Sequence, residues 1–326
     1  MKLSAAFLNQ CGADTGYPPS TLEKVAALGE VAAAVARHPL LGGALTLKGG
    51  TALNLCSGQA PARLSVDLDY NYVAQPGREA MLAQRPGIEQ ALETLVQRLG
   101  FRLQRSADAF AGRKFYAHYP SAFGAEDRVE IDLNFLWRVP LDDPRQAAMW
   151  QPGELDRPAI PVVAPLELCV GKLLAFLDRT APRDVWDTIQ LPILAPSAFQ
   201  SPLLRPLFIA FSAMLPHPLT AYGRDQLAAR LTPGDIRDQL LPMLAASGGA
   251  DAADLMEQAW TVAAPLLGLG PNEQAYVDAV QEGVPRLDLL FPDDPDRARR
   301  IAQHPVILWK LKNVRQQKGR PDPGPQ

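Results

Sequence analysis

The sequence predicts an α+β fold, with a core over residues 1–195 that mixes strands and helices and a helical C-terminal region over residues 196–326. Segments 65–72 and 128–136 alternate apolar and polar side chains, which is the period of a half-buried strand. After Pro192 this alternation disappears, and Ala- and Leu-rich stretches separated by Pro and Gly follow. Because 47% of the 326 residues are hydrophobic and 21% are charged, the chain can bury a large core, which excludes disorder over most of its length.

Helices and strands are expected to alternate in the first hundred residues. Ser20-Thr21-Leu22-Glu23 has the form of a capping box, and apolar residues then recur at helical spacing. Gly49 follows a short apolar segment and is suited to the tight turn that ends a strand. The expected elements are a helix at 20–37, a strand at 44–48, a helix at 51–57, a strand at 65–72 and a helix at 86–99.

The remainder of the chain predicts three more strands and then only helices. A Pro- and Asp-rich stretch at about 139–164 is expected to be a connection, and Pro165 suits the first turn of the helix that follows it. The strands are expected at 101–106, 113–119 and 128–136, and the core helices at 165–178 and about 182–191. The C-terminal helices are expected at 202–214, 224–231, 235–246, 251–267 and 271–281.

Several classes of protein receive no support from the sequence. The three cysteines form no CxxC pair, which favours a reducing cytoplasm over a disulfide framework. The N-terminal apolar stretch is too short for a signal peptide and no long apolar window exists, so we expect a cytoplasmic protein with no membrane partner. The four histidines lack zinc-site spacing and no GxSxG motif is present, which argues against zinc and serine-hydrolase chemistry.

A first motif combines two carboxylates with a glycine turn. Asp67 and Asp69 are two residues apart on a predicted strand, so both project from one face. Neighbouring carboxylates repel each other unless a cation lies between them, and such oxygen ligands suit Mg²⁺ together with phosphate oxygens. Gly49-Gly50-Thr51 leads into a helix, whose N-terminus favours a phosphate. The combination predicts a site for a nucleoside triphosphate and its metal; the alternative is a solvated strand face beside a simple turn.

A second motif contains a third carboxylate. Asp132 lies on the polar face of segment 128–136, whose other face is fully apolar, so this strand is expected to be central. A third carboxylate would complete a two-metal site or act as the base that deprotonates an attacking hydroxyl. Glu130 lies on the same face and is an alternative, and a plain surface position for Asp132 is another.

A third motif lies on the two helices expected between residues 165 and 191. Lys172 interrupts an apolar helix face, where its ammonium is placed to reach a phosphate or to lie at the edge of that face. Asp184 and Asp187 are three residues apart and share one face of the next helix. They are placed to orient Lys172 and Arg183, or to cap the start of their helix.

In combination these motifs resemble the AbiEii/AbiGii toxin family of nucleotidyltransferases, which includes the mycobacterial MenT toxins. The resemblance covers about residues 17–195 and rests on segments 47–54 and 63–69, and on Lys172-Leu173 with Arg179 followed by Arg183-Asp184 with Asp187. It implies a DNA-polymerase-β-like nucleotidyltransferase core with a helical C-terminal region. It also implies a toxin of a toxin–antitoxin or phage-defence pair. Such a toxin transfers nucleotides from an NTP, with Mg²⁺, to tRNA 3′ ends and so blocks translation, and a separately encoded antitoxin controls it.

The resemblance also implies roles for individual residues. Asp67 and Asp69 would hold the metal ions, with Asp132 as the third carboxylate. Lys172 would neutralise phosphate charge in the transition state, and Asp187, or alternatively Asp184, would support it. The residues expected around the nucleotide are Lys48, Gly49, Gly50, Thr51, Ser65, Arg183 and Asp184.

The acceptor of the nucleotide is the least determined feature. The formal net charge of -3 argues weakly against nucleic acid, but two basic tracts support an RNA acceptor whose backbone they would hold. The alternatives are an enzyme that modifies a protein or small molecule, and a catalytically silent binding protein. The sequence does not determine which NTP or tRNA is used. The tracts comprise Arg98, Arg102, Arg105, Arg113 and Lys114, and then Arg297, Arg299, Arg300, Lys310, Lys312, Arg315, Lys318 and Arg320.

Overall fold

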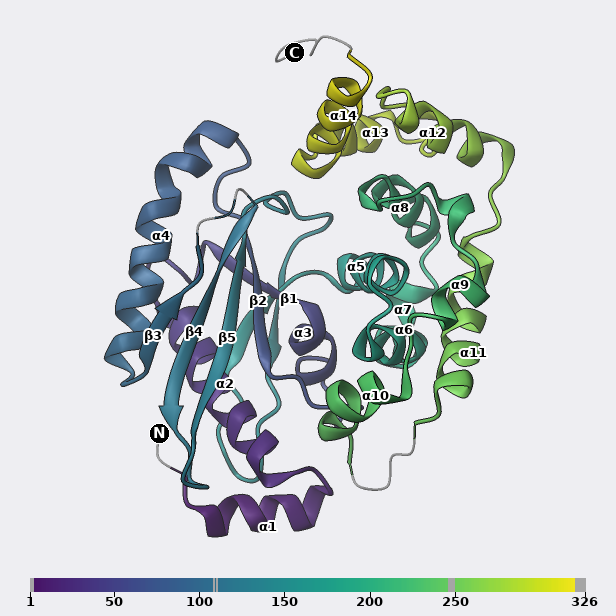
Figure 1. The fold of residues 1–326 in the computed structure, drawn as a ribbon. Helices are drawn as coiled ribbons and strands as arrows, with labels where there is room; N and C mark the ends of the chain where they lie inside the picture. The colour runs from purple at the N-terminus through teal and green to yellow at the C-terminus, as the bar shows by residue number, and fades with distance from the viewer. Residues whose placement is uncertain (1–2, 108, 110, 246–249, 320–326) are drawn as a thin grey trace. The chain divides into compact units, whose positions relative to one another are not determined.

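A seven-stranded mixed sheet organises the first half of the chain (Figure 1). Its strands are β1 (Leu45–Lys48), β2 (Asp67–Tyr72), β3 (Arg102–Arg105), β4 (Gly112–Pro120), β5 (Glu126–Asn134), β6 (Arg145–Ala148) and β7 (Ala159–Val162). They lie in the order β3-β4-β5-β2-β1-β7-β6. The pairs β2–β5 and β1–β7 are parallel, and the other neighbouring pairs are antiparallel. Strand β5 lies between β4 and β2, which confirms that segment 128–136 is a central strand.

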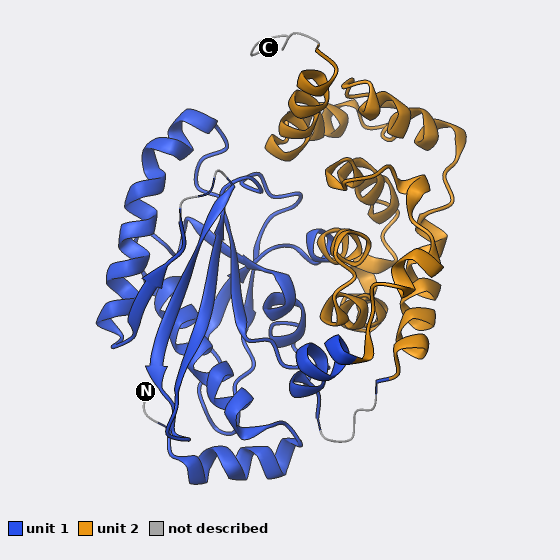
Figure 2. Ribbon diagram, in the orientation of Figure 1, with its two compact units in different colours: residues 1–168, 234–250 blue, residues 169–233, 251–326 orange. Residues whose placement is uncertain are grey.

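The computed structural model describes residues 3–107, 109, 111–245 and 250–319. The chain forms two compact units, each described here by itself (Figure 2). Unit 1 comprises residues 1–168 and 234–250, and unit 2 comprises residues 169–233 and 251–326. The expected domain boundary at residue 195 stays a prediction, because packing units need not coincide with functional domains.

Unit 1 packs helices against the apolar face of the sheet. Its helices are α1 (Ala5–Thr15), α2 (Pro19–Arg37), α3 (Gly49–Leu55) and α4 (Arg78–Arg98). Leu68, Tyr70 and Tyr72 of β2 are fully buried in one hydrophobic core with apolar residues of α2 and α4. Helix α3 packs on β1 and β2, the two strands that flank it in sequence. Since apolar residues of β2 face this core, its alternate residues Asp67, Asp69 and Asn71 project from the opposite face.

Unit 2 contains only helical and irregular segments within its described residues. Its longer helices are α5 (Pro165–Asp178), which starts in unit 1, α6 (Pro182–Leu194), α8 (Leu204–Phe211), α11 (Ala252–Ala263), α12 (Pro271–Gln281), α13 (Pro295–Ala302) and α14 (Pro305–Gln317). Helix α6 packs on α11, and α12 packs on both α8 and α14. The core includes the fully buried side chains of Phe176, Phe208 and Tyr276. The predicted loss of strands after Pro192 is confirmed for this part of the chain.

Several local expectations differ from the structure. The connection expected at 139–164 contains the antiparallel pair β6–β7, whose four-residue strands are too short for a clear alternation. Helix α2 begins at Pro19 without the predicted capping box, because the Glu23 carboxylate accepts hydrogen bonds from Ser121 Oγ and the Ala122 N–H instead. Helix α4 begins at Arg78, earlier than expected, and accommodates Pro86 in its interior. Helices α1, α13 and α14 were not expected.

Candidate active site

The polar face of β2 presents the two carboxylates of the DxD motif. Asp67 and Asp69 are both partly exposed, whereas Leu68 and Tyr70 between and after them are completely buried. The strand alternation predicted from the sequence therefore places both carboxylates on the face away from the α2–α4 core. Asn71 continues this face but is buried, with 1% of its surface exposed.

Strand register aligns four charged residues across this face. Lys48 of β1 lies opposite Asp69, Asp69 lies opposite Asp132 of β5, and Asp132 lies opposite Lys114 of β4. Residues directly opposite each other in neighbouring strands project to the same side, so these four side chains form one row. We call Lys48, Asp67, Asp69 and Asp132 the carboxylate face. The register thus brings Asp132 beside the DxD motif.

The same register helps to decide whether Asp132 or Glu130 is the third carboxylate of the site. Glu130 lies opposite Asp67, but its carboxylate forms an ion pair with Lys114. Asp132 makes no side-chain hydrogen bond or ion pair with any described residue. Burial raises the pKa of Asp132; the Lys48 ammonium lowers it in part, and the Asp69 carboxylate raises it further. This arrangement favours Asp132 over Glu130 as the third functional carboxylate.

The two glycines at the start of α3 lie close to the side chains of Asp69 and Arg63. Gly49 has a φ of 75°, a left-handed conformation that other residues rarely adopt. A Cβ at Gly49 would collide with the Asp69 carboxylate, and a Cβ at Gly50 would lie 2.5 Å from a guanidinium nitrogen of Arg63. Gly49 therefore allows the start of α3 to approach Asp69 closely, and Gly50 leaves room for the Arg63 guanidinium.

Two hydroxyl groups anchor the start of β2. Thr51 Oγ1 donates a hydrogen bond to the Asp67 carbonyl oxygen at 2.5 Å, and it lies 2.9 Å from Ser65 Oγ. The side chains of Thr51 and Ser65 are buried. They link α3 to the strand that carries the DxD motif, which is a positioning role that the sequence alone did not indicate. Their predicted contact with a triphosphate stays a prediction.

In unit 2, the downstream motif forms two separate ion pairs. Lys172 Nζ of α5 lies 2.6 Å from Asp187 Oδ2 of α6, and the Asp187 side chain is completely buried. Arg179 binds both carboxylate oxygens of Asp184, at 2.8 and 3.1 Å. The alternatives left by the sequence are thus separated, since Asp187 pairs with Lys172 and Asp184 with Arg179. Arg183, the expected partner of these acids, is partly exposed on α6.

Comparison with known proteins identifies the family to which this combination of motifs belongs. Residues 33–276 match the family described as "Nucleotidyl transferase AbiEii toxin, Type IV TA system". The chain belongs to the AbiEii family of nucleotidyltransferase toxins. The matched range contains every predicted site residue, from Lys48 to Asp187. No curated protein matches the chain.

A solved structure supports the fold of this AbiEii-family chain. MenT4, a nucleotidyltransferase toxin from Mycobacterium tuberculosis H37Rv, is similar to it with a TM-score of 0.66. The two chains share 20% sequence identity, and the similarity covers 92% of this chain and 99% of MenT4. At this identity the likeness shows a common fold, and it confirms the predicted mixed nucleotidyltransferase architecture.

The family implies a divalent metal, and the donors present suit one in part. Among the described residues, no three or more His, Cys, Asp or Glu side chains are grouped closely enough to hold a metal ion by themselves. The Asp67 and Asp69 carboxylates are nevertheless hard oxygen donors on one face, and Mg²⁺ is commonly held by one or two carboxylates plus substrate phosphates. The donor set therefore fits a metal that binds together with a triphosphate. Asp132 as a third ligand stays a prediction.

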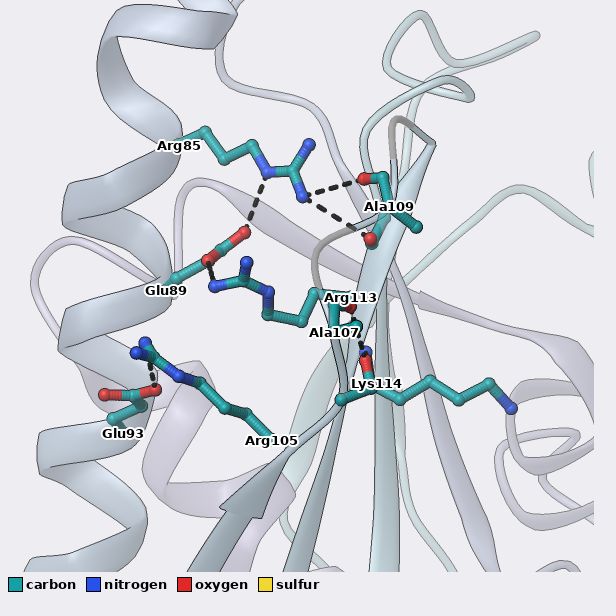
Figure 3. Close-up of polar contacts among 10 residues, drawn as sticks. Arg85, Glu89, Glu93, Arg105, Ala107, Ala109, Arg113 and Lys114 are labelled. Atoms are coloured by element: carbon teal, nitrogen blue, oxygen red, sulfur yellow. Dashed lines mark hydrogen bonds and ion pairs between the residues drawn. The ribbon is translucent and has the colours of Figure 1, made fainter.

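Three arginines of the first basic tract form ion pairs with acidic residues of unit 1. Arg102, Arg105 and Arg113 each pair with a carboxylate, at 2.6, 3.2 and 2.6 Å. Figure 3 shows Arg113 reaching Glu89 of α4, while Lys114 extends to the other side of β4. Their carboxylate partners belong to segments that are distant in the sequence, so counting the charges within the tract did not reveal these ion pairs.

Most of the second tract is folded. Helices α13 and α14 contain residues 295–302 and 305–317, and the buried residues of α14 include Leu311 and Val314. Lys310 Nζ donates to the Leu215 carbonyl oxygen at 3.0 Å, and Arg315 Nε donates to the Gly283 carbonyl oxygen at 2.9 Å. Residues 305–317 therefore form a packed helix, and Arg320 lies outside the described residues. No described helix combines the length and hydropathy that a membrane span requires.

Proposed function

We propose that this protein is the toxin of a toxin–antitoxin pair and transfers nucleotides from an NTP, with Mg²⁺, to tRNA 3′ ends, which blocks translation. The observation that carries the proposal is the carboxylate face, where Asp67, Asp69 and Asp132 project beside Lys48 and the Gly49 turn. Membership of the AbiEii family supports a separate antitoxin and a cytoplasmic target. A role in phage defence is part of the same proposal.

Each group on the carboxylate face has a distinct task in this reaction. Asp67 and Asp69 would hold Mg²⁺, which would offset the charge of the triphosphate oxygens. Asp132 accepts the proton of the acceptor's terminal hydroxyl, a role supported by its raised pKa and its lack of a side-chain partner among the described residues. The hydroxyl oxygen attacks the α-phosphorus, and pyrophosphate leaves.

The downstream motif contributes a positive charge. Lys172 neutralises charge on the phosphates as pyrophosphate departs, and Asp187 holds its ammonium in place. Asp184 has a structural task, because it fixes Arg179 at the end of α5. Thr51 and Ser65 act by anchoring the DxD strand, in addition to their expected position near the triphosphate.

The test is a transfer assay with purified protein, Mg²⁺ and each labelled NTP in turn. Total tRNA and total cell protein serve as separate acceptors. We expect label on tRNA that disappears in Asp67→Ala and Asp69→Ala. Asp143→Ala is the matched control, since this carboxylate also lies in unit 1 but is exposed in the loop before β6 and is not part of the carboxylate face. It should retain wild-type transfer.

Other outcomes of the same assay decide between the remaining functions. Label on protein or on a small molecule would replace tRNA as the acceptor and leave the nucleotidyltransferase assignment intact. Absence of transfer to any acceptor, together with normal growth of cells that express the protein, would refute the enzymatic proposal and favour a silent binding protein.

A further inference from the structure

The polar side of the sheet continues beyond the carboxylate face onto β4 and β3. Tyr116 of β4 lies between two buried residues of the core, so its ring projects from the side that carries Asp132. The side chains of Arg102 and Lys114 are 62% and 47% exposed, and Tyr116 is partly exposed, so solvent reaches this area. We call it the open sheet face, which comprises Arg102 and Gln104 of β3, Tyr116 and His118 of β4, and Arg128 of β5.

Strand register arranges the polar side of the sheet in three rows that differ in charge. The first row contains Asp132, and together with the second row, two residues further along the strands, it holds four carboxylates and two lysines. The third row holds two arginines and a histidine. Its one carboxylate partner among the described residues is Glu126, which lies 2.6 Å from Arg102 and 3.3 Å from His118. The rows are Lys48, Asp69, Asp132 and Lys114, then Asp67, Glu130, Tyr116 and Gln104, then Arg128, His118 and Arg102. Negative charge therefore gives way to positive charge along the strands.

An arginine and a tyrosine stack on each other between these rows. The Arg128 guanidinium lies over the Tyr116 ring, with its Cζ atom 4.8 Å from the ring centroid. No described residue forms a hydrogen bond or ion pair with this guanidinium. Arg105 and Arg113, in contrast, point to the other side of the sheet and pair with glutamates of α4 (Figure 3). A guanidinium on an aromatic ring offers a flat surface to a nucleobase and a positive charge to a phosphate.

A phosphate can bind at the third row without breaking a strong interaction. Arg128 has no carboxylate partner among the described residues. The Arg102–Glu126 pair is exposed on both sides, at 62% and 53% of the two side chains, and exposed ion pairs are weak. The planar guanidinium group matches the geometry of phosphate oxygens. Since the bases of a duplex are stacked inside it, an unpaired strand is needed to place a base on Tyr116.

We propose that the open sheet face binds a single-stranded RNA 3′ end, with a base stacked on the Tyr116–Arg128 pair and phosphates at Arg102 and Arg128. The proposal rests on the function proposed above, in which the terminal hydroxyl reaches Asp132. The third row is four residues from Asp132 along the strands, which is about 13 Å and leaves room for about two nucleotides. The order of charge places the 3′ hydroxyl at the carboxylates and the preceding phosphates at the arginines.

The test measures binding of a six-nucleotide RNA, labelled at its 5′ end and with a free 3′ hydroxyl, by fluorescence anisotropy without NTP. We expect Tyr116→Ala to weaken binding about tenfold and Tyr116→Phe to change it less than about twofold, since the ring is what stacks. Arg128→Ala should weaken binding and lower the slope of log affinity against log salt by about 0.7, whereas Tyr116→Ala should leave this slope unchanged.

Two exposed residues outside the open sheet face provide matched controls. Phe123, an aromatic residue in the turn between β4 and β5, is 43% exposed, so Phe123→Ala is compared with Tyr116→Ala. Arg157 is exposed between β6 and β7 and has no carboxylate partner among the described residues, so Arg157→Ala is compared with Arg128→Ala. Both control variants should bind RNA like wild type. If Tyr116→Ala does not fold, Tyr116→Leu keeps apolar contacts without the ring and must show the same loss.

Several outcomes would overturn the proposal. These are unchanged RNA binding in Tyr116→Ala, an equal loss in Tyr116→Phe, or binding of a blunt RNA duplex as tight as that of the single strand. Equal competition by a polyglutamate peptide of the same charge would also overturn it, in favour of a surface for acidic proteins. Missing transfer to tRNA, together with RNA binding that depends on Tyr116, would refute the proposed function alone. Normal transfer to tRNA with unchanged RNA affinity in Tyr116→Ala would refute the role of the open sheet face alone.

Discussion

The Glu167 carboxyl should make the stability of unit 1 depend on pH near neutrality. Burial raises its pKa from 4.5 to about 7 in the folded protein. A carboxyl with a higher pKa in the folded state stabilises folding while it is protonated. Its contribution is therefore fully present below about pH 4.5 and is lost as the pH rises through 7. The difference of 7 - 4.5 corresponds to about 3 kcal/mol at 1.36 kcal/mol per pH unit.

Urea unfolding of wild type and Glu167→Gln at pH 5 and pH 8 measures this contribution. The uncharged amide cannot titrate, so the variant lacks the loss of stability that the carboxyl produces. The free energy of unfolding of wild type relative to Glu167→Gln should fall by about 2.5 kcal/mol between the two pH values, because the unfolded carboxyl is already largely ionised at pH 5. The groups that contact the Glu167 carboxyl are the Asn71 amide from β2 and the Leu141 N–H from the loop after β5, and neither of them is ionisable.

Glu23→Gln serves as the reference for replacing a buried, doubly hydrogen-bonded carboxylate, and its pH dependence is compared with that of Glu167→Gln. Unfolding should be followed by circular dichroism and by tryptophan fluorescence, since coincident transitions are required before a single free energy can be assigned. If the free energy of unfolding changed equally with pH in wild type and Glu167→Gln, the reasoning would be refuted. Such a result would mean that burying the ionised Glu167 carboxylate carries no energetic cost.

Three further substitutions test the packing around the motifs. Lys172→Met removes the ammonium that pairs with the buried Asp187 carboxylate and should cost about 3–5 kcal/mol in urea unfolding, with recovery when Asp187→Asn is added. Gly49→Ala should lower the melting temperature by several degrees because of its positive φ and the contact with Asp69, whereas Gly171→Ala, in a helix with open space around its Cβ, should be neutral or stabilising. Leu311→Ala should cost about 2–5 kcal/mol, and a result below 0.5 would contradict burial of α14.

The sequence predicts the central strands and the DxD face because both depend on local alternation. Residues 65–72 and 128–136 show a clear period of two, and the structure places β2 and β5 there, side by side. The edge pair β6–β7 could not be predicted in the same way, since each strand is four residues long and β6 is mostly exposed. Helix α14 was missed because Lys310, Lys312 and Arg315 were assigned to a basic tract, while the burial of its apolar residues depends on contacts with other helices.

Which residues lie opposite each other in neighbouring strands could not be predicted from one sequence. Asp132 was a candidate because of its strand, but its position opposite Asp69 depends on the register of β2 with β5. The same is true of Lys114, whose ion pair engages Glu130 and which sequence reasoning placed only in a basic tract. Glu167 gives no sequence signal beyond being an acid in the first turn of a helix, which is a common and weak feature.

The balance of charge on the carboxylate face explains why a nucleotide should arrive there together with a metal ion. Three carboxylates project beside one lysine, and Glu130 on the same face is already paired with Lys114. A bare triphosphate would meet repulsion from this excess of negative charge. A divalent ion bound to the triphosphate reverses that interaction, since it gains the carboxylates as ligands. The Lys48 ammonium offsets only part of this negative charge, because three carboxylates share the face with it.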